Sequence, residues 1–202
     1  MSMAQLKPRY SVDDYLAIER ESKERHIYLD GEIYAMAGES PAHGDISTNT
    51  LGLLYSQLKG TPCRARTKDT KVRSGRIPMS GKGTSGLFSY PDILVVCGEP
   101  EYHDAFKDVI LNPTTIVEVL SESTEAFDRG EKFRRYRKWN PTLRDYILVS
   151  QDKPQIEHYE RQPNGRWSFD SHEGLESEVV IASIRCVLKL ADVYDRIVFA
   201  EE

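Results

Sequence analysis

Residues 90–96 read Tyr-Pro-Asp-Ile-Leu-Val-Val, residues 115–121 read Thr-Ile-Val-Glu-Val-Leu-Ser, and residues 128–136 read Asp-Arg-Gly-Glu-Lys-Phe-Arg-Arg-Tyr. The two apolar runs are short, β-branched and bounded by turn residues, which is typical of buried strands. Yet the first run starts on Asp92 and the second carries Glu118 in its middle. An ionised carboxylate in an apolar strand is unfavourable unless a cation or several donors meet it. This stretch therefore predicts a buried acidic site.

The third segment supplies a cation. Asp128, Lys132 and Tyr136 are spaced by four and would share one face of a helix. Two carboxylates close together repel, raise a pKa, or share a metal ion. We therefore expect Asp92, Glu118 and Lys132 to form a divalent-metal site with a lysine beside it. Two structural alternatives stay open: Asp92 could cap its strand, and Glu118 could pair with a nearby arginine.

The composition indicates a globular protein. The chain has 202 residues, 39% hydrophobic and 29% charged, and we expect residues 1–202 to form a single domain with one substantial core. No apolar run approaches the roughly 20 residues that span a bilayer, and the N-terminus has no apolar segment of signal-peptide length. We expect no membrane partner.

The three cysteines, Cys63, Cys97 and Cys186, are widely spaced and odd in number. They predict neither a disulfide framework nor a metal-binding knuckle, and they indicate a reducing cytoplasm. Cys97 lies in an apolar run, where a small core residue is expected.

Two basic clusters lie on either side of the predicted acids, in residues 64–82 and 129–138. The net charge of −5 argues mildly against a nucleic-acid partner, but the distribution of charge matters more than its sum. Each cluster could be a solvated face. Alternatively, the two could line a groove that holds phosphates around a metal site.

The flanking segments have recognisable start and stop signals. Ser11 is the expected N-cap of a first helix, and Asp30-Gly31 divides a hairpin over residues 25–36. Glu32 follows that turn, and His43 opens a helix over residues 42–59. Both are further candidates for the site, although a histidine at a helix start is often a capping or surface residue.

The remaining elements follow from alternation and turn residues. We expect one or two strands in residues 63–76, with basic side chains on one face, and a loop over 77–88 that is either a mobile lid or a connector. A charged connection (98–112), a strand (144–149), a hairpin (156–169), a strand (179–184) and a closing helix (188–197) complete the chain.

These motifs resemble the PD-(D/E)xK nuclease superfamily and, more closely, the Uma-two family of endonucleases. The segments that carry the resemblance are 30–32, 40–43, 90–92, 117–124, 128–136 and 145–149. The resemblance implies an α/β (α+β) fold with a restriction-endonuclease-like core, in which helices flank a mixed central sheet with added β-hairpins. Leu120 stands where the superfamily pattern has a lysine. The Uma-two pattern takes its lysine from the next helix, which implies Lys132.

The resemblance also implies a reaction, the hydrolysis of phosphodiester bonds in nucleic acid, with DNA expected. Asp92, Glu118 and the Val119 carbonyl would hold one or two Mg²⁺ or Mn²⁺ ions. Lys132 would act on the attacking water or on the phosphate charge. Glu32 could support a second metal or its water shell, and His43 is an auxiliary candidate.

Two other functions are compatible with parts of the sequence. A non-catalytic nucleic-acid-binding module on the same fold would keep the basic clusters but have no affinity for metal. A two-carboxylate glycosidase is disfavoured, because the chain shows no aromatic-rich sugar platform and the acids lie beside a lysine helix. Exposed edge strands would also allow a homodimer.

Overall fold

The computed structural model describes residues 9–36, 38–76 and 83–199. The helical elements are α1 (Val12–Glu21), α2 (Pro41–Leu58), α3 (Glu125–Phe127), the π-helical turn η1 (Asp128–Lys132), α4 (Phe133–Trp139), the 3-10 turn η2 (Ala182–Ile184) and α5 (Leu190–Val193). The strands are β1 (His26–Leu29), β2 (Glu32–Ala35), β3 (Cys63–Thr67), β4 (Lys71–Ser74), β5 (Leu87–Ser89), β6 (Ile93–Cys97), β7 (Val109–Ile110), β8 (Thr115–Val119), β9 (Asp145–Val149), β10 (Gln155–Arg161), β11 (Trp167–Glu173), β12 (Glu178–Ile181) and β13 (Cys186–Lys189).

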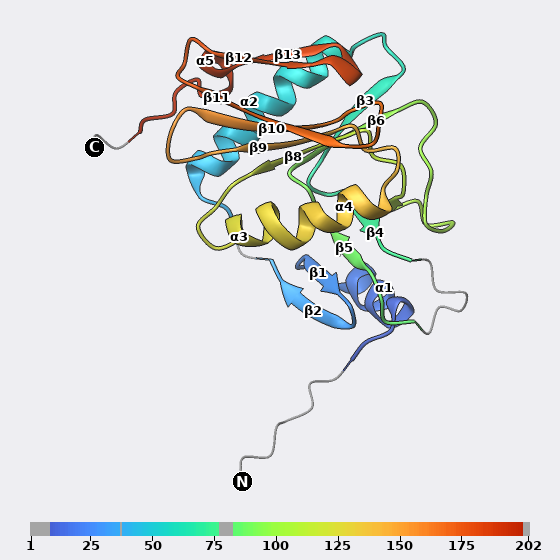
Figure 1. The fold of residues 1–202 in the computed structure, drawn as a ribbon. Coiled ribbons are helices and arrows are strands. Elements are labelled where there is room, and N and C mark those ends of the chain that lie inside the picture. The colour runs from blue at the N-terminus through green and yellow to red at the C-terminus, as the bar shows by residue number, and fades with distance from the viewer. Residues whose placement is uncertain (1–8, 37, 77–82, 200–202) are drawn as a thin grey trace.

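A mixed six-stranded sheet forms the centre of the molecule, in the order β11-β10-β9-β8-β6-β3. Its β8–β9 pair is parallel and its other pairs are antiparallel. Helix α2 and the β12–β13 pair cover one face, whereas α4 lies on the other, between this sheet and the β1–β2 hairpin (Figure 1). A second sheet has the order β2-β1-β5-β4-β7. The predicted α+β architecture, with helices flanking a mixed sheet and added hairpins, is confirmed.

Alternation along β8 decides which face each side chain meets. Val117 and Val119 belong to the apolar cluster on the α2 side, and Ile116 and Leu120 belong to the cluster on the α4 side. Because successive side chains of a strand point to opposite faces, Glu118 faces α4. The sheet therefore directs this acid toward the helix that carries the expected lysine.

The N-terminal predictions are confirmed in detail. The Ser11 hydroxyl accepts a hydrogen bond from the Asp14 amide at 3.1 Å, and the Asp14 carboxylate accepts one from the Ser11 amide, which is a capping box. Asp30 and Gly31 turn the β1–β2 hairpin with φ values of 47° and 96°.

The C-terminal region differs from the prediction. Leu188 was expected to open a closing helix over residues 188–197, but it pairs with Val179 in the β12–β13 hairpin. Helix α5 keeps only four residues, Leu190–Val193. A run of alternate apolar residues fits a strand or a short helix, so its pattern alone did not decide between them.

The first basic cluster is solvated only in part, since Arg64 and Arg76 are exposed and two other members are buried. Lys71 and Arg73, both on β4, are buried. The Lys71 ammonium forms an ion pair with Asp108 at 2.9 Å, and the Arg73 guanidinium donates to the Arg76 carbonyl at 2.6 Å. Buried charges need such partners, and Asp108 is too distant in the chain to be recognised as one. The expected lid or connector over residues 77–88 lies partly outside the described residues, which resume at 83.

The expectation for the cysteines was wrong. Cys63 and Cys97 face each other across the β3–β6 pair and form a disulfide, with their Cα atoms 3.9 Å apart. Cys97 is thus a bridging residue and not a simple core residue, while Cys186 is free and buried. The inference of a reducing cytoplasm loses its support from the cysteines and stays a prediction. Within the described ranges, no helix combines the length and apolar character needed to cross a bilayer.

Candidate active site

The pairing of β6 with β8 sets the distance between the two acids. Ile93 lies opposite Val117 in this antiparallel pair, so the next position in the same register sets Asp92 opposite Glu118. The carboxylate oxygen Oδ2 of Asp92 accepts a hydrogen bond from the Val119 amide at 2.8 Å. A segment 27 residues away in the chain thus fixes Asp92 beside the end of β8.

Helix α2 contributes His43 from its first turn. The Ser40 hydroxyl caps this helix by accepting a hydrogen bond from the His43 amide at 3.1 Å, and Pro41 occupies the first helical position. The capped turn holds the imidazole against the acid, with Nε2 of His43 2.9 Å from Oδ1 of Asp92. Both oxygens of Asp92 therefore have a partner.

The helix after β8 contributes Lys132. Its ammonium lies 2.8 Å from Oε1 of Glu118 and 2.9 Å from Oδ1 of Asp128. These contacts come from η1, a π-helical turn between α3 and α4; such wide turns occur frequently at functional sites. Sequence reasoning placed Asp128 on the lysine's face but did not include it in the site. The spacing of four residues was the available signal.

Aromatic packing holds this helix in place. The Tyr146 hydroxyl on β9 donates to the Asp128 carbonyl at 2.9 Å, and the Phe133 ring stacks on Tyr146 with centroids 4.9 Å apart. The hydroxyls of Tyr136 and Ser89 are hydrogen-bonded at 2.7 Å. The sheet therefore anchors both ends of the turn that carries Lys132.

The site holds more negative than positive side chains. Glu118, Asp128 and Lys132 are only 2%, 3% and 4% exposed. Burial raises the pKa of Glu118 well above its ordinary value, with added contributions from the carboxylates of Asp128 and Asp92, while Lys132 acts in the opposite direction. Burial by itself would lower the pKa of Lys132, but the Asp128 and Glu118 carboxylates keep it well above its ordinary value. The Lys132 ammonium thus pairs with two of the three acids, Glu118 and Asp128.

The site contains oxygen atoms of the kind that a hard cation prefers. Oε1 of Glu118 is buried without a geometrically suitable hydrogen bond, although it lies close to Lys132. Oxygen atoms of Asp92 and Glu118, with the Val119 carbonyl nearby in the chain, match the ligands that Mg²⁺ prefers. No group of three or more His, Cys, Asp or Glu side chains in the described parts of the chain is arranged to hold a metal.

The site residues differ in exposure. The side chains of Asp92 and His43 are 15% and 12% exposed, whereas those of Glu118 and Lys132 are 3% and 5% exposed. Asp92 and His43 therefore have more contact with solvent than Glu118 and Lys132. Glu32 lies half-buried on β2, where its carboxylate accepts a hydrogen bond from the Tyr34 hydroxyl at 2.6 Å. The role of Glu32 in the site stays a prediction.

The fold is shared with a solved structure. A crystal structure described as a putative nuclease of the family DUF820, from Anabaena variabilis, superposes with a TM-score of 0.71 at 15% sequence identity. The comparison covers 94% of this chain and 99% of that one. At this identity the likeness concerns the fold alone.

Sequence comparisons give the family. Residues 12–189 match the model of the Uma2 family, described as putative restriction endonucleases. Two uncharacterized proteins of Synechocystis sp. are similar: slr1290 is 37% identical over 79% of this chain and 78% of its own length, and sll1609 is 29% identical over 82% and 89%. The chain belongs to the Uma2 family, which confirms the expected family and supports a nuclease-type hydrolase that acts on nucleic acid.

Proposed function

We propose that this chain is a divalent-metal-dependent endonuclease that hydrolyses phosphodiester bonds in DNA. The observation that carries the proposal is the convergence of Asp92, Glu118 and Lys132, which come from two paired strands and a following helix. Acids and a lysine close together, with perturbed pKa values, are frequent at catalytic sites. The proposal treats residues 1–202 as one domain.

Asp92, Glu118 and the Val119 carbonyl would hold the cation, Mg²⁺ or Mn²⁺. A bound cation supplies a water of lowered pKa and positive charge beside the phosphate. The raised pKa of Glu118 means that the carboxyl must lose its proton before it can act as a ligand. His43, hydrogen-bonded to Oδ1 of Asp92, is a positioning residue that orients this acid.

Lys132 is the residue we assign to the reacting phosphate. Its ammonium is held by Asp128 and therefore keeps its orientation and its charge. From this position it would stabilise negative charge on the phosphate or orient the attacking water. Asp128 is a positioning residue for the ammonium. Glu32 is proposed to support the water shell of a second metal.

The test is cleavage of supercoiled and linear duplex DNA, single-stranded DNA and RNA with Mg²⁺, Mn²⁺ or no added metal. We expect metal-dependent cleavage of DNA that is lost in Asp92→Asn and Glu118→Gln. These variants keep the size of each side chain and leave the buried Lys132 with Asp128. Glu122→Gln, an exposed position just after β8, is the matched control and should cleave normally. Equal cleavage by all four proteins would reject the proposal.

One observation favours a second candidate, a nucleic-acid-binding module without catalysis. Lys132 lies 2.8 Å from Oε1 of Glu118, where a cation would otherwise bind, and both side chains are buried. Calorimetry with Mn²⁺ at neutral pH distinguishes the two candidates. A nuclease should bind Mn²⁺ in the wild type and lose this affinity in Asp92→Asn, whereas a binding module should show no heat in either protein.

A homodimer remains part of the proposal only as an expectation from the exposed edge strands β2 and β11. Two copies would let two sites act on the two strands of a duplex. Sedimentation equilibrium with and without a DNA duplex measures this assembly.

A further inference from the structure

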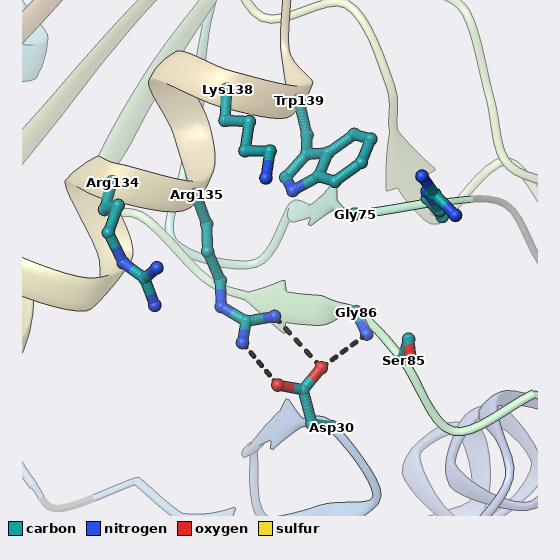
Figure 2. A pocket seen from close by; sticks show the side chains of 9 residues that line it. Asp30, Gly75, Ser85, Gly86, Arg134, Arg135, Lys138 and Trp139 are labelled. Atoms are coloured by element: carbon teal, nitrogen blue, oxygen red, sulfur yellow. Dashed lines mark hydrogen bonds and ion pairs between the residues drawn. The ribbon is translucent and has the colours of Figure 1, made fainter.

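A second group of charged side chains lies on the exposed side of helix α4. A cavity of about 240 Å³ separates the end of α4 from the β1–β2 turn and the facing ends of β4 and β5 (Figure 2). Six side chains define its chemistry: Asp30, Arg76, Arg134, Arg135, Lys138 and Trp139. We call this cavity the basic pocket. It contains none of the acids of the candidate active site.

The charges in the basic pocket do not cancel. The Arg135 guanidinium pairs with both oxygens of Asp30 and contacts Glu131 through Nε at 2.5 Å. Arg134 also contacts Glu131, through Nε at 3.0 Å, yet its side chain is 64% exposed. The four cations that line the pocket therefore meet two carboxylates. The result is a concentrated positive charge on a chain with a net charge of −5, which is an electrostatic feature suited to an anion.

Trp139 holds the two remaining cations at the pocket. The Lys138 ammonium lies 5.0 Å from the indole centroid and the Arg76 guanidinium lies 6.0 Å from it, both within the range of cation–π attraction. In the described residues, neither cation has an ion pair with a carboxylate. Basic groups around an aromatic ring are the combination that single-stranded nucleic acids bind, through phosphate contacts and stacking.

The wall of the pocket depends on two glycines. Gly75 and Gly86 have φ values of 144° and 141°, and a Cβ on Gly75 would lie 2.7 Å from the Gly86 Cα. The two backbones therefore approach more closely than side chains allow. The Gly86 amide donates to Oδ1 of Asp30 at 2.9 Å, which in turn holds Arg135. The pocket is thus formed by fixed backbone as well as by surface side chains.

We propose that the basic pocket binds a backbone phosphate of a nucleic-acid strand, with Trp139 against the adjoining sugar or base. The inference rests on the proposed function, because it treats that strand as the substrate. Lys132 and Lys138 are on one helix and about 9 Å apart along its axis, at 1.5 Å per residue. The pocket would therefore hold a phosphate that lies several nucleotides away from the bond that is cut.

Helix periodicity separates the two sites on different faces. Lys132 and Tyr136 are four residues apart and buried, whereas Arg134 and Lys138 are four residues apart and exposed. Substitutions on the exposed face should therefore leave the acids and Lys132 in place. This allows the basic pocket to be tested separately from the chemistry.

The experiment measures binding of a fluorescent single-stranded oligonucleotide in EDTA, at several salt concentrations. The test protein is the triple variant Arg76→Ala, Arg134→Ala and Lys138→Ala. A matched triple variant, Lys153→Ala, Arg166→Ala and Lys189→Ala, removes three exposed charges outside the pocket. The logarithm of the binding constant falls linearly with the logarithm of the salt concentration. For a single strand, each phosphate contact contributes about 0.7 to this slope. Because the pocket holds one phosphate, we expect the slope to fall by about 0.7 in the pocket variant and to stay unchanged in the control.

A direct readout comes from Trp139. The chain has two tryptophans, so Trp167→Phe leaves Trp139 as the only fluorophore of this type. We expect the oligonucleotide to quench this emission at concentrations where inorganic phosphate and a mononucleotide do not. Equal quenching by free phosphate would overturn the inference of a strand and indicate a small-anion site. An oligonucleotide that leaves Trp139 unaffected would also overturn it.

Cleavage assays distinguish failure of this inference from failure of the proposed function. Binding lost only in the pocket variant, without cleavage by any protein, supports the basic pocket and rejects the nuclease. Cleavage by the wild type with unchanged binding by the pocket variant rejects the basic pocket and leaves the nuclease. If both hold, substrates too short to reach from the bond that is cut to the pocket should lose the difference between wild type and variant.

Discussion

Glu118 is the residue whose environment is hardest to explain by structure alone. Its carboxyl is buried among aromatic and aliphatic side chains, with one ammonium shared between it and Asp128. A carboxyl whose only purpose was to neutralise Lys132 would be unnecessary, because Asp128 already does so. A buried carboxylate without its own positive partner destabilises the folded protein. The presence of Glu118 is explained if this carboxylate has a second partner, such as a divalent cation.

The raised pKa of Glu118 predicts an effect on stability. The folded protein binds this proton more tightly than the unfolded chain, whose pKa is about 4.3. The resulting stabilisation is fully present below about pH 4.3 and is lost as the pH rises through the folded pKa. The glutamine of Glu118→Gln does not titrate, so the variant lacks this pH-dependent loss of stability. As the pH increases, the free energy of unfolding of the variant should therefore fall less than that of the wild type.

Urea unfolding between pH 4 and pH 8, without added metal, measures the difference. The exposed Glu122→Gln serves as the control and should follow the wild type. Parallel pH profiles for wild type and Glu118→Gln would show that burial does not raise the pKa of this carboxyl.

Some residues of the candidate site stand out in the sequence because they depart from a local pattern. Asp92 and Glu118 are acids next to or within apolar strands, and Lys132 follows on a helix. Asp128 was missed as a site residue because an acid near a helix start is ordinary and signals no function. Glu32 was singled out by its position next to a turn. A position next to a turn does not predict which contacts the carboxylate makes.

At the scale of elements, the π-helical turn η1 supplies Asp128 and Lys132 to the candidate site. Gly130 lies in its middle, exposed, with no positive φ and nothing within 4 Å of where a Cβ would be. Gly130→Ala should therefore stabilise the protein by about 0.4–1 kcal/mol, since alanine restricts the unfolded chain. Urea denaturation measures the gain, and metal affinity should not change. A loss of stability would mean that the turn itself requires glycine.

The Cys63–Cys97 disulfide joins the edge strand β3 to β6, across 34 residues. Closing a loop of this size typically contributes about 2–4 kcal/mol. Cys63→Ser with Cys97→Ser should lower the free energy of unfolding by that amount in non-reducing buffer. As a check, thiol titration of the denatured wild type should find one free thiol, that of Cys186. Three titratable thiols would show that the bridge does not form.

Elements with turn chemistry were predictable, and elements that depend on distant partners were not. The hairpin β10–β11 follows from alternation around residues 163–165, and the capping box of α1 is local. The burial of Lys71 depends on Asp108, and the disulfide depends on the register of β3 with β6. Neither dependence is visible in a single sequence, because both join segments that are more than 30 residues apart.

At the scale of the whole molecule, helix α4 connects the two larger sheets. Tyr136 packs in the cluster with β8 and β9 and is also hydrogen-bonded to Ser89 on β5. Asn140, at the end of α4, donates to the Arg73 carbonyl on β4 at 3.0 Å. We therefore predict that residues 1–202 unfold as one domain in a single transition. Far-ultraviolet circular dichroism and tryptophan fluorescence should give the same urea midpoint. Separate midpoints would divide the chain into two units.

The β6–β8 register described above has a consequence for misfolded copies. A slip of one residue between two strands turns every side chain of one strand to the opposite face. Asp92 and Glu118 would then point into different layers, and the amide of Val119 would no longer meet Asp92. Under the proposed function, molecules with this wrong strand register would be unable to cut nucleic acid. Hydrolysis would therefore be confined to chains whose central sheet has assembled correctly.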